Sequence, residues 1–130
     1  MHTITIKDET AVGKVLNEIQ LAFENEFITV EELIKQRVFH EVNQFNNKGN
    51  EMFSGLVQPT DTEVALNGFK MKNRRKVDKE KQVYIALNAF KKNGFFIIVD
   101  NQQVDKLEDK VLVSGDTDVS FIKLTPLVGG

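Results

Sequence analysis

The chain has 130 residues, a net charge of −2, an isoelectric point near 5.7 and no cysteine. A chain of this length, of which 41 % is hydrophobic, can bury one core, so we expect a single domain covering residues 1–130. The weak negative charge excludes a general attraction to nucleic acid or anionic membranes, and the lack of cysteine excludes disulfides and a catalytic thiol. No stretch has the roughly 18 apolar residues of a membrane span, and we expect a cytoplasmic protein.

The N-terminal residues predict a β-hairpin. Polar and apolar residues alternate over Thr3–Lys7, which is typical of a strand that buries one face, here with Ile4 and Ile6. A turn is expected around Val12–Lys14, and the alternation resumes over Val15–Glu24. The two strands are close enough in sequence to pair with each other.

A helix is expected to begin at Thr29. Thr29 and Glu32 have the spacing of a capping box, in which each side chain accepts a hydrogen bond from the other's backbone N–H group. The stretch Asn46–Gly49 supplies the end of the helix. Apolar residues between these limits recur at helical spacing and predict one buried face, made of Val30, Leu33, Ile34, Val38, Val42 and Phe45.

Residues about 50–77 are expected to form an insertion, because glycine and proline interrupt its short apolar runs. A second helix is predicted over about 78–92, with Asp78 as its N-cap and Gly94 as its C-terminal cap. The basic residues that lie between Lys70 and Lys81 are interpreted as a solvated loop before this helix. They are not taken as a nucleic-acid site.

The last third of the chain predicts strands separated by turns. Phe95–Val99 is a continuous apolar run, typical of a buried strand, and we expect it at the centre of the sheet. A turn at Asp100–Asn101, a short strand at Val111–Val113 and a turn at Ser114–Asp116 follow. The final strand is expected over Val119–Leu124.

The sequence ends in two glycines, Gly129 and Gly130. A terminal glycine offers a carboxylate with no Cβ beside it, so such a tail can enter a channel too narrow for other residues. Pro126 cannot donate a backbone hydrogen bond, so we expect the sheet to end near it and to release an extended tail. Such a carboxylate can be a substrate, and the alternative for this ending is a frayed terminus with no role.

Four segments resemble a known family: Phe96–Gln102, Ser114–Asp116, Val119–Phe121 and Pro126–Gly130. Together with the order of elements, they resemble the ubiquitin-like sulfur carriers, which include the small subunit of molybdopterin synthase and the thiamine-biosynthesis sulfur carrier. The resemblance implies an α+β fold of the β-grasp type, a mixed sheet with a helix across it. The segment of about 50–77 and the second helix would be additions to this fold.

The resemblance also implies a function. In such carriers a separate adenylating enzyme uses ATP to activate the carboxylate of the last glycine, here Gly130, which then becomes a thiocarboxylate for sulfur transfer to an acceptor enzyme. One alternative is a protein modifier conjugated through Gly130 to lysines of target proteins, and another is a β-grasp binding module without activation. The chain has no phosphate-binding loop and no cysteine nucleophile, so we expect no enzyme activity and no bound cofactor.

The tail and the last strand are the expected docking region for these partners. Along a strand, Phe121 points to one face and Ile122 and Leu124 to the other, so one set faces away from the core. His2 and His40 lie on different predicted elements, and no metal site is expected. The predicted docking residues are Phe121, Ile122, Leu124, Pro126, Leu127 and Val128, beside the activation site at Gly129 and Gly130.

Overall fold

The computed structural model of the chain describes residues 1–48, 52–53, 55–57, 62–65, 68–71 and 77–123. These residues have an α+β structure, with two helices, a mixed five-stranded sheet and two smaller sheets. The chain divides into two units, Met1–Leu33 with Ala89–Gly130, and Ile34–Asn88. The boundaries between the two units fall inside helix α1 (Val30–Lys48) and helix α2 (Lys79–Lys91). The single domain expected from the sequence stays a prediction.

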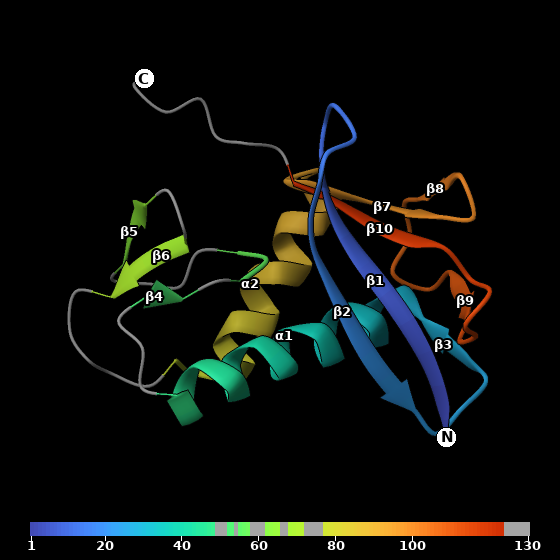
Figure 1. Cartoon of the computed structure of the whole chain (residues 1–130), viewed down its shortest axis with the longest axis horizontal. Coiled ribbons are helices and arrows are strands. Elements are labelled where there is room, and N and C mark those ends of the chain that lie inside the picture. Colours follow the sequence, from blue (N-terminus) through green and yellow to red (C-terminus); the bar gives the residue numbers. More distant parts are fainter. Residues whose placement is uncertain (49–51, 54, 58–61, 66–67, 72–76, 124–130) are drawn as a thin grey trace. The chain divides into compact units, whose positions relative to one another are not determined.

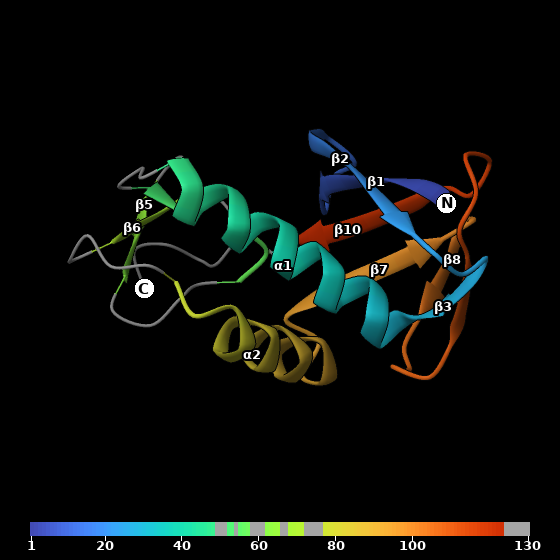
Figure 2. The same cartoon turned by 90° about the horizontal axis from the view of Figure 1, so that it is seen from below.

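The first unit contains the five-stranded sheet, in the order β2-β1-β10-β7-β8. The first and last strands, β1 and β10, lie side by side and run parallel, and the other neighbours are antiparallel (Figures 1 and 2). The prediction that Phe95–Val99 is the central strand is wrong, because β10 occupies the centre and β7 lies next to it. The bounds are β1 His2–Thr10, β2 Val15–Phe23, β7 Phe95–Val99, β8 Gln102–Val104 and β10 Val119–Lys123.

The predicted N-terminal hairpin is confirmed. Strands β1 and β2 pair antiparallel, and Ile4 and Ile6 are fully buried on one face of β1. Gly13 has a φ of 87°, a conformation that costs glycine little, and its N–H group donates to the carbonyl oxygen of Thr10 at 2.9 Å. A bulge near Asp8 ends the regular pairing before this turn.

The turn at Asp100–Asn101 is also confirmed. Both residues have positive φ, 49° and 67°, and they form the two-residue loop between β7 and β8. This geometry matches the right-handed twist of the two strands, and Asp and Asn adopt it at lower cost than most residues. The backbone N–H group of Asp118 donates to the Asp100 carboxylate at 3.0 Å, which connects the turn to the start of β10.

A two-stranded sheet is formed by the strand that leads into helix α1 and a strand from the last third of the chain. The short strands β3 (Phe27–Thr29) and β9 (Lys110–Leu112) pair antiparallel, a contact that the sequence did not predict. The predicted cap is present, because the N–H group of Glu32 donates to the Thr29 hydroxyl at 3.1 Å. The N–H group of Val30 donates to the carbonyl oxygen of Asp109 at 2.9 Å, so the loop before β9 satisfies another helix-terminal donor.

The second unit contains most of α1 and α2 and the segment expected to be an insertion. Three short strands of this segment form an antiparallel sheet in the order β4-β6-β5, with bounds β4 Met52–Phe53, β5 Thr62–Ala65 and β6 Gly68–Met71. The apolar face predicted for the first helix is buried, as expected. The buried apolar residues of this unit include Ile34, Val38, Val42, Phe45, Leu56, Val57, Val77 and Ala86.

Helix α2 begins at the N-cap that the sequence predicted, Asp78. At its C-terminal end the residue in the left-handed conformation is Asn93, one residue before the predicted cap Gly94. The Asp78 carboxylate accepts hydrogen bonds from the N–H groups of Glu80 and Lys81 at 3.0 and 3.2 Å. At the other end Asn93 has a φ of 60°, and Gly94 donates to the carbonyl oxygen of Ala89 at 2.7 Å. Gly94 therefore follows the left-handed residue in a Schellman motif.

Candidate functional site

The end of the central strand β10 is the starting point of the predicted site. Lys123, its last residue, is paired with Thr10 of β1 on one side and with Phe95 of β7 on the other. The strand therefore ends beside the β1–β2 turn and the beginning of β7. Six residues predicted to act in activation or docking follow this point and lie outside the described residues: Leu124, Pro126, Leu127, Val128, Gly129 and Gly130.

Phe121 belongs to the core of the first unit. Its side chain has no exposed surface, and its ring stacks on Phe95 with 5.9 Å between ring centroids. Phe95 also packs against Phe90, with 5.8 Å between the ring centroids and the two rings tilted relative to each other. Because aromatic side chains of this kind bury a large apolar area, Phe121 contributes to the stability of the sheet. In this conformation its side chain is not part of a docking surface.

Ile122 points to the opposite face of the sheet, as the alternation of side chains along a strand predicts. Its cross-strand partner on β7 is Phe96, and the next pair on the same face is Ser120 with Ile98. Phe96, Ile98 and Ile122 are each partly exposed. We call these three residues the outer apolar patch. Of the two predicted docking residues that the structure describes, Ile122 is thus the one available at the surface.

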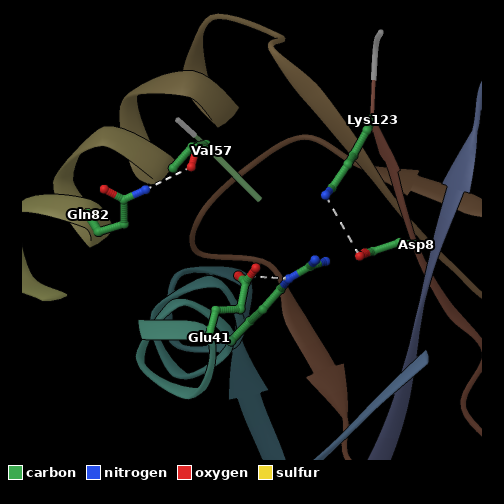
Figure 3. Close-up of polar contacts among 6 residues, drawn as sticks. Asp8, Glu41, Val57, Gln82 and Lys123 are labelled. Atoms are coloured by element: carbon green, nitrogen blue, oxygen red, sulfur yellow. Dashed lines mark hydrogen bonds and ion pairs between the residues drawn. The ribbon is translucent and has the colours of Figure 1, made fainter. Parts of the chain in front are cut away.

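A buried carboxylate lies at the same end of the sheet. The Asp8 side chain is 5 % exposed and forms an ion pair of 4.0 Å with the Lys123 ammonium group, which is 30 % exposed (Figure 3). A buried charge is costly unless it is paired, so this contact lowers the cost of burying Asp8. Asp8 was not among the residues predicted for the site, although it follows Ile4 and Ile6 at alternate positions of β1 and therefore faces the core with them.

The second unit contains a buried ion pair of its own. The Arg37 side chain is 1 % exposed, and its Nε donates to the Glu41 carboxylate at 3.3 Å, one helical turn away (Figure 3). Gln82 of α2, also buried, donates to the carbonyl oxygen of Val57 at 2.8 Å. These contacts give buried polar groups their hydrogen-bond partners, so a structural role accounts for these residues. The burial of Arg37 was not predicted, although Arg37 lies at helical spacing from the buried residues Val30, Leu33 and Ile34.

The described residues give no sign of a metal centre. His2 is exposed and His40 is partly exposed, and across the described ranges no three His, Cys, Asp or Glu residues are grouped to hold an ion. Neither helix of this part of the chain combines the length and the apolar character needed to cross a membrane.

No protein-family model, no curated protein and no solved structure matches this chain.

Proposed function

We propose that this chain is a ubiquitin-like carrier of the β-grasp type and that Gly130 bears the terminal carboxylate of the mature chain. A partner enzyme in the cytoplasm adenylates this carboxylate with ATP, and the adenylate is converted to a thiocarboxylate for sulfur transfer to an acceptor enzyme. One observation carries the proposal: the first strand β1 and the last strand β10 lie side by side and parallel within a mixed sheet. This pairing is the one expected when a β-grasp sheet leads directly into a C-terminal tail.

In the proposed reaction the carrier contributes only the carboxylate of Gly130. A carboxylate oxygen of Gly130 attacks the α-phosphorus of ATP, pyrophosphate leaves, and a sulfur donor then displaces AMP from the acyl adenylate. Seven residues separate Lys123 from the end of the sequence, and a stretch of seven residues spans at most about 25 Å. The absence of Cβ atoms at Gly129 and Gly130 suits a narrow enzyme channel.

The outer apolar patch is the proposed contact surface for the adenylating enzyme. Ile122 lies next to the last residue of β10, so an enzyme that holds the tail would also lie close to this face of the sheet. We expect Ile122→Thr to lower kcat/KM for adenylation about fivefold or more, because it removes an apolar contact without removing a core side chain. The matched control is Val12→Ser at the β1–β2 turn, where the side chain is 92 % exposed. An equal loss in both variants would argue against the patch.

Intact-mass spectrometry tests the proposed function. The full chain is incubated with ATP and an extract of its own cells, beside a variant that lacks Gly130. Replacement of one terminal oxygen by sulfur supports the sulfur carrier. Covalent adducts with other proteins, absent from the control, would instead favour the modifier conjugated to lysines. An unchanged mass without adducts would favour a binding module that does not use its tail.

A further inference from the structure

Strand β2 forms one edge of the five-stranded sheet, and it is long. It spans nine residues, whereas β8 at the opposite edge spans three (Figure 1). Within the part of the chain that the structure describes, β1 is the strand paired with β2, so the outer side of β2 presents backbone donors and acceptors. Proteins commonly blunt such edges with short strands, lysine, proline or covering segments.

The sequence of β2 has few of these protective features. Val15–Phe23 contains no lysine and no proline, and its single charged residue is Glu18. Glu18, Gln20 and Ala22 are exposed, so the described residues leave the outer face of β2 uncovered at these three positions. The bulge beside Asp8 disturbs the pairing near the hairpin turn alone. The remaining part, Asn17–Phe23, pairs with β1 in unbroken register and is a regular strand.

This regular segment is compatible with a second copy of itself. It has seven residues with Gln20 at its centre, so an antiparallel pair about a two-fold axis at Gln20 would match its full length. On the core face, Ile19 would then lie opposite Leu21 of the other copy. On the outer face, Glu18 would lie opposite the other copy's Ala22. No like charges face each other in this register, which satisfies the main electrostatic requirement for pairing.

We propose that β2 pairs antiparallel with β2 of a second copy of this chain, centred on Gln20. The product is a two-fold symmetric dimer with one continuous sheet of ten strands, five from each copy. A contact confined to one strand pair lies near the lower end of specific interface sizes, so the dimer forms reversibly and depends on concentration. Because β1 separates β2 from β10 in the sheet, the contact does not use Ile122 or the other residues of the outer apolar patch.

Two substitutions at one exposed position test this register. Ala22→Glu places two carboxylates opposite each other, at the pair formed by residues 18 and 22, and this repulsion occurs twice in the dimer. Ala22→Lys places opposite charges at the same two pairs. From the usual energy of cross-strand charge pairs, we expect A22E to raise the dissociation constant about fivefold and A22K to lower it about fivefold.

Sedimentation equilibrium of the full-length wild type and both variants measures these constants over about 1 µM to 1 mM. The wild-type mass is expected to rise with concentration from 14.8 kDa toward twice that value. Thermal unfolding followed by circular dichroism verifies that both variants fold. A wild-type chain that stays monomeric over the whole range would overturn the proposal and would leave the β2 edge to a strand from another protein. Equal dissociation constants for A22E and A22K would also overturn it.

Hydrogen exchange of the wild-type chain provides a readout that needs no variant. Amide exchange in Asn17–Phe23 is expected to slow at the concentrations where the mass rises, because the outward N–H groups of β2 become hydrogen-bonded. Unchanged exchange in this segment, at concentrations where a dimer forms, would place the contact elsewhere and overturn the proposal.

Discussion

Replacing Phe121 with alanine should destabilise the protein far more than the same replacement of Ile122, its neighbour in sequence. Phe121 is fully buried on the central strand and stacks on Phe95, whereas Ile122 is partly exposed on the opposite face of the sheet. The two substitutions therefore compare the two faces of β10. They also separate the core residue from the proposed docking residue.

The expected magnitudes follow from burial. A fully buried phenylalanine replaced by alanine usually lowers the unfolding free energy by about 3–5 kcal/mol, and the stacked pair with Phe95 places Phe121 in the upper part of this range, about 4–5 kcal/mol. Ile122→Ala removes a side chain that is partly exposed, so about 1–2 kcal/mol is expected. The difference of about 2 kcal/mol or more is large against a typical total stability of about 5–15 kcal/mol.

Urea unfolding of the wild type, F121A and I122A, followed by circular dichroism, measures both values. Ile122→Ala is predicted to retain the fold and, if the proposed function holds, to bind the adenylating enzyme more weakly. Equal costs, or a larger cost for I122A, would mean that the assignment of the two faces of β10 is wrong. Ile122 would then not be the surface residue that the proposed docking contact requires.

Substitutions at three further sites have defined outcomes. Asp78→Ala removes the carboxylate that caps α2 and should lower the unfolding free energy by about 1 kcal/mol, while Asp78→Ser should keep most of it, as urea unfolding would reveal. Asn93→Ala should lower the unfolding free energy by about 1 kcal/mol, because the φ of 60° at this position is unfavourable for alanine. Asn93→Gly should leave the unfolding free energy unchanged, because glycine adopts this φ readily. Similar melting temperatures of the two variants would refute this prediction. Arg37→Met removes the arginine partner of the buried Glu41 carboxylate and should lower the unfolding free energy by about 3–5 kcal/mol in urea unfolding. The double variant R37M/E41L removes both charges and should regain much of that loss.

Local patterns in the sequence predicted much of the secondary structure. The alternation around Ile4 and Ile6 predicted a strand with one buried face, and the Thr29 and Asp78 caps predicted where two helices begin. Each of these features depends on residues close together in the chain. Periodicity and capping therefore carry the necessary information.

Two features that were not predicted, the central place of β10 and the β3–β9 pair, depend on contacts between distant segments. The apolar run Phe95–Val99 indicated burial, but burial alone does not decide which strand is central, and β10 holds that place. A short strand was predicted at Val111–Val113, where β9 lies, but its partner β3 has three residues and is too short for a periodic signal. The buried charges of Asp8 and Arg37 were recognisable from their positions on apolar faces, yet polar residues are usually assigned to the surface.

The most direct test of the proposed carrier function is chemical trapping of the activated carboxylate. Hydroxylamine converts an acyl adenylate or a thioester to a hydroxamate, so it reports activation before the pathways to sulfur transfer and conjugation diverge. The full chain is incubated with extract of its own cells, ATP and hydroxylamine, and trypsin, which cleaves after Lys123, releases the peptide Leu124–Gly130 for tandem mass spectrometry. The proposal predicts a hydroxamate at Gly130 that requires ATP. A terminal peptide that keeps its free carboxylate with and without ATP would contradict it.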